Sequence, residues 1–181
     1  CRLSRWADLI ICNSFAGKAY AMRHGIPAGR IVVVANGIDT TEFKPDPEGR
    51  RCLRAEWKIG DEHLLVGLVG RLDPLKDHGT FLRALAILTG QRQDVRAICI
   101  GNRTEPHMTG LANLATALQL DKRLIWVGEQ ANMPAVYSAL DVLVSASLGE
   151  GFSNTIAEAM ACGVPCVVTD VGDSARIVGD E

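Results

Sequence analysis

Three absences in this 181-residue sequence exclude whole classes of function. Its 19 basic residues are outnumbered by 21 acidic ones, and no run of lysine or arginine marks a nucleic-acid-binding surface. No apolar run approaches the ~18 residues of a membrane-spanning helix. The six cysteines lack paired C-x-x-C spacing, so they do not predict a zinc site. Free thiols indicate a reducing compartment, and we expect a cytoplasmic protein.

Metal-ligand patterns are missing as well. No two histidines have the spacing of a metal site, and no Asp-x-Asp occurs in the chain. A divalent metal that bridges phosphates is therefore not expected. The sequence also lacks the G-x-S-x-G turn that presents a catalytic serine.

What the sequence does contain is a regular alternation of strand and helix patterns after residue 63. Strands are predicted at 64–69, 95–100, 124–127, 141–145 and 166–169, and helices at 78–88, 109–120, 133–139 and 155–161. This alternation predicts an α/β fold, a Rossmann-like parallel sheet with helices on both faces. Such sheets bind ligands at the C-terminal ends of their strands, beside a topological switch point.

The chain before residue 63 divides at a polar, proline-marked stretch. Strands are predicted at 7–13 and 31–35, the second fully apolar as buried parallel strands are, with a helix at 14–24 between them. From 41 to 62 the composition becomes polar, with a short helix at 51–57. We interpret 1–40 as the remnant of one domain, 41–62 as a linker and 63–181 as a second domain.

The stretch 147–165 carries the strongest functional signal. It is typical of a loop followed by a short helix, with Ser153 or Asn154 able to cap the helix start. Gly163 and Pro165 follow the helix and end it. The unpaired N–H groups at such a start attract anions, so we expect a phosphate there.

Glu158 breaks the apolar face that Ile156 and Met160 predict for this helix. Helical side chains lean toward the N-terminus, so Glu158 would point toward the phosphate and accept hydrogen bonds from the hydroxyls of an attached sugar. Glu150, on the loop before the helix, would face the other end of such a ligand. The alternative is an exposed Glu158 on a solvated face.

A second candidate loop, 67–79, follows the first strand of the main domain. Its Arg71 and Lys76 are expected at the same edge of the sheet as the helix start at 153–154. A guanidinium fork and an ammonium suit two adjoining phosphates, although two surface cations near an aspartate are the commoner case. Together the two loops predict a diphosphate site.

These residues resemble those of the retaining glycosyltransferases of family four (glycosyl transferases group 1), which have the GT-B fold. The resemblance rests on Gly70-Arg71 with Lys76, and on the E-x7-E pair Glu150 and Glu158 within E-G-F-S-N-T-I-A-E-A-M-A-C-G-V-P. The segments A-D-L-I-I-C-N-S and V-A-N-G-I-D-T-T-E-F-K-P are similar to the end of that family's N-terminal domain. The resemblance implies that 63–181 is the nucleotide-sugar-binding C-terminal half of a GT-B fold, truncated at its end.

The resemblance also implies roles. The domain would bind a nucleoside diphosphate sugar for retaining, metal-independent transfer to a saccharide or lipid acceptor, with no cofactor. Arg71 and Lys76 would hold the diphosphate and share the catalytic role with Glu150, while Glu158 would take the ribose. The other implied donor contacts are Gly70 beside the cations, Gly151 and Phe152 at the sugar, Ser153, Asn154 and Thr155 at the helix start, and Val127, Gly128 and Glu129 at the base.

Two positions depart from the family pattern. After Val171-Gly172 the family often has a second glycine and, three residues later, a glutamate, where this chain has Asp173 and Arg176. The resemblance therefore carries no sugar contact over to this loop. The acceptor-binding domain is almost wholly missing, so we expect this chain to bind donor without transferring it. Peripheral association of the full-length enzyme with the inner membrane face stays open.

Two other interpretations remain. Gly149-x-Gly151-x-x-Asn154 imitates the G-x-G-x-x-G of a nicotinamide dinucleotide-binding domain, and Asp170 ends the next strand as a ribose-binding acid should. Against this, Asn154 replaces the third glycine and no chain is left for the nicotinamide half. A GT-B sugar-nucleotide epimerase or phosphorylase would share the fold and differ in its products.

Overall fold

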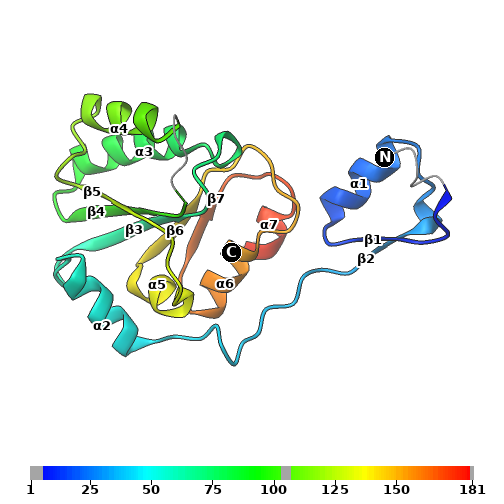
Figure 1. Cartoon of the computed structure of the whole chain (residues 1–181), viewed down its shortest axis with the longest axis horizontal. Coiled ribbons are helices and arrows are strands. Elements are labelled where there is room, and N and C mark those ends of the chain that lie inside the picture. The colour runs from blue at the N-terminus through cyan, green and yellow to red at the C-terminus, as the bar shows by residue number, and fades with distance from the viewer. Residues whose placement is uncertain (1–5, 103–106, 180–181) are drawn as a thin grey trace.

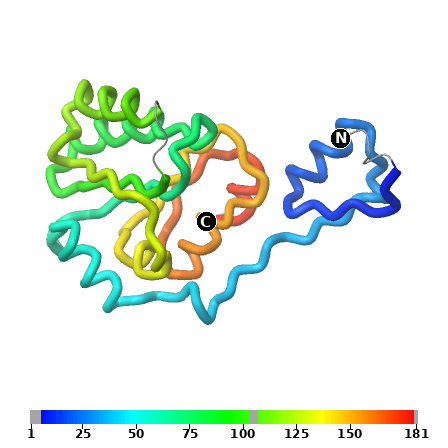
Figure 2. Tube along the Cα trace, viewed as in Figure 1, coloured from blue at the N-terminus to red at the C-terminus, as the bar shows by residue number. Residues whose placement is uncertain are grey.

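The computed structural model describes residues 6–102 and 107–179, which form a main α/β domain and a smaller N-terminal unit joined by an extended segment (Figure 1; Figure 2). Five strands, all paired in parallel, make the main sheet in the order β5-β4-β3-β6-β7. Helices pack on both faces of this sheet. The predicted α/β class is confirmed.

All five predicted strands of the main domain are present. They are β3 (Leu64–Val69), β4 (Val95–Ile100), β5 (Leu124–Val127), β6 (Val142–Ser145) and β7 (Cys166–Val168). The helices are α2 (Pro47–Glu56), η3 (Pro74–Lys76, a 3-10 helix), α3 (His78–Gln91), α4 (His107–Ala117), α5 (Met133–Ala139), α6 (Asn154–Ala161) and α7 (Ser174–Val178), of which η3 and α7 were not predicted. Within the described ranges, none of them combines the length and apolarity needed to cross a bilayer.

Side chains that alternate along the central strands contribute to two hydrophobic cores, one on each face of the sheet. On β4, Ala97 and Cys99 contribute to the core formed with α3 and α4, whereas Ile98 and Ile100 contribute to the core formed with α5 and α6. Both faces of the central strands are therefore buried. This explains why these strands are apolar along most of their length, with the half-buried Arg96 of β4 as an exception.

The buried face of α6 differs from the predicted one. Ile156 and Ala159 are fully buried, whereas Met160 is 38% exposed. The buried positions are thus three residues apart, and the expectation that Met160 lies on the sheet is wrong. The orientation of α6 about its own axis, with Ile156 and Ala159 toward the core, also sets the position of Glu158.

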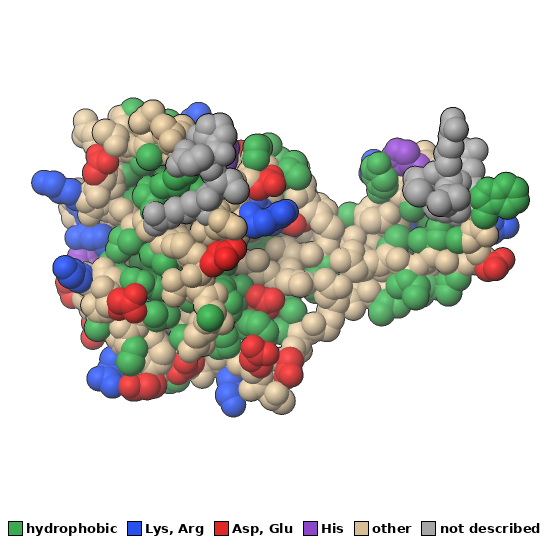
Figure 3. All heavy atoms as spheres, viewed as in Figure 1, with side chains coloured by type: hydrophobic (Ala, Val, Ile, Leu, Met, Phe, Trp, Pro, Cys, Tyr) green, Lys and Arg blue, Asp and Glu red, His purple; other side chains and the backbone are tan. Residues whose placement is uncertain are grey.

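The N-terminal unit contains β1 (Ile10–Cys12), α1 (Phe15–Arg23), η2 (Ala28–Arg30) and β2 (Ile31–Val33), with β1 and β2 paired in parallel. Val32 and Val34 are 45% and 56% exposed, so the expectation of a buried second strand is wrong. Trp6 and Ile11 are exposed as well, and apolar side chains gather over this unit in Figure 3. No described residue of α1 is buried. The unit has little core of its own.

Helix α2 lies within the segment that we interpreted as a linker, and it packs against α5 of the main domain (Figure 1). It begins at Pro47 rather than at the predicted Arg51. Asp46 caps it by accepting a hydrogen bond from the Gly49 N–H at 2.9 Å, and proline suits the first helical position. The second half of the segment is therefore part of a packed layer.

Asp141 ties α2 to the sheet. Its Oδ2 accepts hydrogen bonds from the Leu65 N–H at 2.7 Å and from Arg54 at 3.2 Å, and its Oδ1 accepts one from Arg50 at 2.7 Å. Burial raises the pKa of Asp141, but the Leu65 N–H and the two guanidinium groups outweigh burial and hold the pKa below its ordinary value of 3.8. The Arg54 side chain is only 4% exposed. Asp141 is therefore the carboxylate that compensates the buried charge of Arg54.

The Asp141→Asn substitution should destabilise the fold by about 3 kcal/mol, because Arg54 would stay buried without a counter-charge. Glu48→Gln is the matched control: it removes the partner of Arg51 in an exposed ion pair and should leave stability nearly unchanged. Urea unfolding measures both variants. The contribution of Asp141 is complete above the unfolded pKa, near 3.8, and is lost as pH falls through the lower folded pKa. Equal losses in the two variants would contradict this role.

Candidate functional site

The strand order of the main sheet brings two loops together at its middle. β3 and β6 are neighbours, although the chain runs from β3 outward through β4 to β5 on one side and from β6 to β7 on the other. This reversal is a topological switch point, where the loops after the two central strands leave a crevice. The loops are residues 70–77 and 146–153, which contain both sets of predicted charged side chains.

The loop after β3 presents Lys76 at the end of η3. Asp73 starts η3 by accepting a hydrogen bond from the Leu75 N–H at 2.8 Å, and Asp77 in left-handed conformation then caps α3. The Leu75 carbonyl accepts a hydrogen bond from the Leu148 N–H at 2.8 Å. The two central loops are therefore joined by a backbone hydrogen bond that does not depend on their side chains.

Lys76 and Glu150 form an ion pair across the crevice, from Nζ to Oε1. The same Glu150 oxygen accepts a hydrogen bond from the Ser147 hydroxyl at 2.8 Å. The side chains of Lys76 and Glu150 are only 24% and 12% exposed. Partial burial strengthens their attraction relative to water. In this structure Glu150 neutralises the charge of Lys76.

Arg71 is a second cation on the same loop as Lys76. Its side chain is exposed, and no hydrogen bond or ion pair joins it to another residue of the described ranges. The Lys76 side chain packs over Gly70, so that a Cβ at Gly70 would lie 3.6 Å from Lys76 Cε. The lysine stem therefore lies in van der Waals contact with the start of the loop after β3.

Helix α6 begins at Asn154, one residue before its predicted start, and Ser153 is at the N-cap position. The predicted side-chain cap is wrong, because the buried Ser153 makes no capping bond and Asn154 Oδ1 instead accepts a hydrogen bond from the Asn36 amide at 2.7 Å. The first N–H groups of an α-helix have no partner inside the helix. Within the described residues those of α6 have no side-chain cap, which leaves them available to an anion.

Glu158 lies one turn deeper on α6 and is half-buried, not on a solvated face. Its Oε2 accepts a hydrogen bond from the Tyr137 hydroxyl at 2.6 Å. Tyr137 is almost fully buried on α5, and burial, followed by the Glu158 carboxylate, raises its pKa above the ordinary value of 10. The phenol therefore keeps its proton at physiological pH and orients Glu158 as a charged acceptor.

The remaining predicted contacts fall in two places. Around the α6 start lie three half-buried residues, Gly151, Phe152 and Thr155. At the sheet edge, two strands away from β3, lie Val127, the last residue of β5, and Gly128 and Glu129 after it. In the part of the chain that the structure describes, no hydrogen bond links this edge loop to Lys76, Glu150 or Glu158. The structure thus brings Lys76, Glu150 and the start of α6 together, and it places the loop predicted for the base two strands away from β3.

Three contacts of this site were not predicted: those of Tyr137, Ser147 and Asn36. A signal for Tyr137 was present, because a tyrosine in the apolar stretch M-P-A-V-Y-S-A needs a partner for its hydroxyl when it is buried. Ser147 lies in the same loop as Glu150, three residues before it, whereas Asn36 reaches the site only through the tertiary fold.

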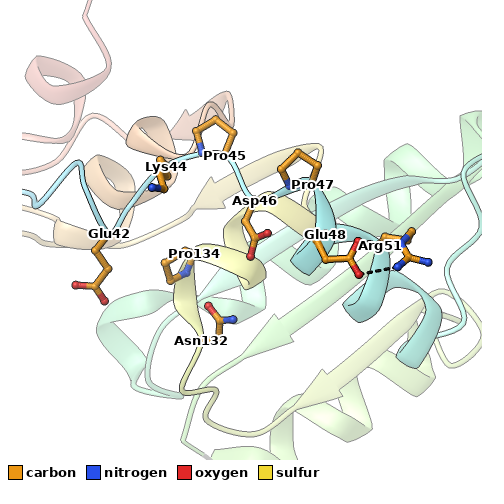
Figure 4. Close-up of a pocket in the computed structure, with 9 residues that line it drawn as sticks. All are labelled: Glu42, Lys44, Pro45, Asp46, Pro47, Glu48, Arg51, Asn132 and Pro134. Carbon is orange, nitrogen blue, oxygen red and sulfur yellow. Dashed lines mark hydrogen bonds and ion pairs between the residues drawn. The ribbon is translucent and has the colours of Figure 1, made fainter.

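A hollow of about 690 Å³ opens elsewhere, at the starts of α2 and α5 (Figure 4). Its lining residues are Glu42, Lys44, Pro45, Asp46, Pro47, Glu48, Arg51, Asn132 and Pro134. None of them is a predicted donor contact, and Glu48 and Arg51 neutralise each other at 2.6 Å. The space that Lys76, Ser153 and Thr155 line together measures only about 10 Å³. A ligand at the switch point would therefore lie over the loops rather than inside the sheet.

Metal-ligating side chains do not converge in residues 6–102 and 107–179, where no group of three or more His, Cys, Asp or Glu could hold an ion. His78 is buried, and burial, followed by the charge of His107, lowers its pKa to about 4, so it is neutral. The cysteines within these ranges are free thiols, and Cys1 lies outside them.

Comparisons with known proteins point to one family. The family model for Glycosyl transferases group 1 matches residues 63–181, and the model for Glycosyltransferase Family 4 matches residues 1–42. A lipopolysaccharide core biosynthesis mannosyltransferase, LpsB, of Rhizobium meliloti is 34% identical over 179 residues, which are 97% of this chain and 49% of that protein. A D-inositol 3-phosphate glycosyltransferase of Rhodococcus jostii is 32% identical over 177 residues, covering 92% of this chain and 38% of that protein.

Solved structures give the same result. Anabaena HepE, crystallised with UDP and glucose, matches with a TM-score of 0.90 and 29% identity over 99% of this chain and 49% of that one. The C-terminal domain of a glycosyl transferase group 1 family protein, LpcC, of Francisella tularensis matches with a TM-score of 0.69 and 30% identity, covering 80% of this chain and 76% of that one. The chain thus spans about half the length of the mannosyltransferase and of HepE.

Proposed function

This chain belongs to the glycosyl transferases group 1 family, with its main domain folded as the C-terminal half of a GT-B enzyme, and we propose that it binds a nucleoside diphosphate sugar at the switch point. The observation that carries this proposal is the Lys76–Glu150 ion pair beside the uncapped start of α6. We further propose that the full-length enzyme transfers the sugar with retention, and without metal, to a saccharide or lipid acceptor.

The diphosphate would lie over the loop of Arg71 and Lys76. Arg71 is exposed, while Lys76 is held by Glu150, so a diphosphate would bind Arg71 first and compete with Glu150 for Lys76. The N–H groups at Ser153 and Asn154 add donors and the positive end of the helix dipole. Together these groups would place fixed positive charge around one anion, as a bridging metal ion does in other enzymes.

The ribose would bind at Glu158. This carboxylate lies one turn beyond the helix start, and the buried Tyr137 hydroxyl holds one of its oxygens at 2.6 Å. The other oxygen and the remaining lone pairs can accept hydrogen bonds from the two ribose hydroxyls. A carboxylate held in this way loses little freedom on binding, which favours affinity.

The same groups would assist transfer. When the bond between the sugar and the diphosphate breaks, its electron pair stays on the phosphate oxygen, and negative charge grows there. Arg71, Lys76 and the α6 N–H groups would stabilise that charge in the transition state, where fixed donors have most effect. We assign Glu150, with Gly151 and Phe152, to the transferred sugar. Retention is what the resemblance to the retaining glycosyltransferases of family four implies.

The first donor to test is UDP-glucose, because crystals of HepE contain UDP, UDP with glucose, and UDP-glucose. GDP and ADP sugars belong in the same panel. The relative of Rhizobium meliloti is a mannosyltransferase, so the sugar, and with it the nucleotide, can differ between members of the family. We propose that the base lies near Val127, Gly128 and Glu129 at the sheet edge. These residues form one wall, so transfer would need the rest of the acceptor-binding domain to exclude water and hold the acceptor.

The nicotinamide alternative loses its main support in this family. Asn154, which replaces the third glycine of the motif, bonds to Asn36 of the segment after β2. That interpretation also leaves Arg71, Lys76 and Glu158 without a role. An epimerase or phosphorylase would use the same donor site, and analysis of the full-length enzyme's products separates it from a transferase.

Arg71→Ala and Lys76→Ala should each weaken UDP binding ~10-fold or more, because each removes a charge-assisted contact to phosphate. Uridine binding should change little. Isothermal titration of this chain measures both ligands, and Lys122→Ala, an exposed lysine before β5, is the control for a general change of charge. Equal losses for uridine and UDP, or an absolute requirement for a divalent metal, would contradict the assignment.

Tyr137→Phe should weaken UDP binding ~3- to 10-fold, because Glu158 loses the hydrogen bond that orients it. Binding of 2′,3′-dideoxy-UDP should be weak in the wild type and unaffected by this substitution. Glu158→Gln should show the same pattern with a larger loss. If Tyr137→Phe weakened the dideoxy nucleotide as much as UDP, Tyr137 would act on general stability and not through the ribose.

A further inference from the structure

A carboxylate of the main domain holds the first helix of the N-terminal unit. Asp173 Oδ2 accepts a hydrogen bond from the Phe15 N–H at 2.7 Å, and Oδ1 accepts one from the Ala16 N–H at 2.8 Å. These N–H groups begin α1 and have no partner within their own helix. Asp173 itself is at the N-cap position of α7, yet its side chain makes no capping bond there. Its carboxylate caps α1 instead.

Burial and charge favour this contact. Asp173 is only 6% exposed, so water and salt screen its charge little. An anion at a helix N-terminus is also stabilised by the helix dipole. Arg176, on α7, lies with its guanidinium carbon 3.8 Å from the centroid of the Phe15 ring, which is a cation–π contact. Asp173 and Arg176 thus hold the same first turn of α1.

The loop that contains Asp173 is in turn hydrogen-bonded to the loop that contains Glu150, and it packs against that loop. The Asp173 N–H donates a hydrogen bond to the Gly151 carbonyl at 3.0 Å. Gly172 has a φ of +61°, and a Cβ there would lie 2.3 Å from the Glu150 carbonyl oxygen. Only glycine allows this conformation and this close approach. The position of α1 is therefore coupled through two short contacts to Glu150.

Ser14 completes the contact from the side of the N-terminal unit. It is buried, and its hydroxyl caps α1 by accepting a hydrogen bond from the Gly17 N–H at 3.0 Å. The same oxygen lies 3.3 Å from the place that a Cβ on Gly151 would take. The start of α1 therefore lies directly against Gly151, a residue that we assign to the transferred sugar.

We propose that Asp173 and Arg176 are positioning residues that fix α1 against the Glu150–Gly151 backbone and so set the place of the Glu150 carboxylate during transfer. This inference deepens the proposed function and rests on it. The two residues are also the two departures from the family pattern, and both contact one helix. Neither touches the donor; they act through α1 and the loop of Glu150.

The structural part of the test compares Asp173→Asn with Asp170→Asn, which removes the same charge from an exposed side chain three residues earlier. In this 181-residue chain, Asp173→Asn should raise the hydrogen-exchange rates of the Phe15 and Ala16 amides ~10-fold or more, because at least one N–H loses its acceptor. Asp170→Asn should leave these rates unchanged. Asp170→Asn should bind UDP within ~2-fold of the wild type, and Asp173→Asn should bind it no more weakly than the wild type, since the cations and α6 are unaltered and a displaced Glu150 carboxylate competes less for Lys76.

Turnover of the full-length enzyme gives the functional part. Asp173→Asn should lower kcat ~10-fold or more with little change in the KM for the donor, because a displaced carboxylate loses transition-state contacts rather than binding. Arg176→Lys, which keeps the charge but loses the flat guanidinium, should lower kcat less. Asp170→Asn should match the wild type.

Each outcome decides a different claim. Faster exchange at Phe15 and Ala16 with unchanged kcat would overturn the positioning role and leave a contact that only holds the two units together. Unchanged exchange would overturn the inference at its first step. If the unsubstituted chain bound no nucleoside diphosphate, the proposed function itself would fail.

Discussion

The ion pair between Lys76 and Glu150 is the interaction on which the candidate site depends. It joins the loops that leave β3 and β6, the two neighbouring strands at which the strand order reverses. η3 holds the lysine and the Ser147 hydroxyl holds the glutamate, so both charges are oriented before a ligand arrives. A site prepared in this way loses little entropy on binding. The pair also implies competition, because an anion that takes Lys76 must displace Glu150.

The sheet and the place of the site could be predicted because their signals are local. The predicted bounds of β3, β4 and β5 match the structure, since each strand is a mostly apolar run, with Arg96 of β4 as the one charged residue among them. The charged residues of the two central loops follow such runs directly, so their common edge follows from parallel pairing. The start of α2 was also marked locally, by Asp46 and Pro47, and our interpretation of 41–62 as a linker missed it.

The remaining contacts could not be predicted, because they join residues that only the tertiary fold brings together. Tyr137 and Glu158 are 21 residues apart, and Asp173 caps a helix that begins 158 residues earlier. Hydrophobic periodicity also fails to predict the buried face of a helix that has small residues on several sides. Alanines flank Glu158, so the sequence allowed either Met160 or Ala159 to face the sheet, and the structure buries Ala159. Contacts between residues far apart in the sequence decide these positions, and local sequence patterns do not record them.

The most direct test of the central claim is the affinity of the Glu150→Gln variant for UDP, measured by isothermal titration at constant ionic strength. Glutamine keeps the size of the side chain but not its charge, so Lys76 would be free to bind phosphate. UDP should bind this variant ~3- to 10-fold more tightly than the wild type, because the carboxylate that competes with the diphosphate for Lys76 is gone. Unchanged or weaker UDP binding would show that the diphosphate does not take Lys76 from Glu150, and would contradict the account.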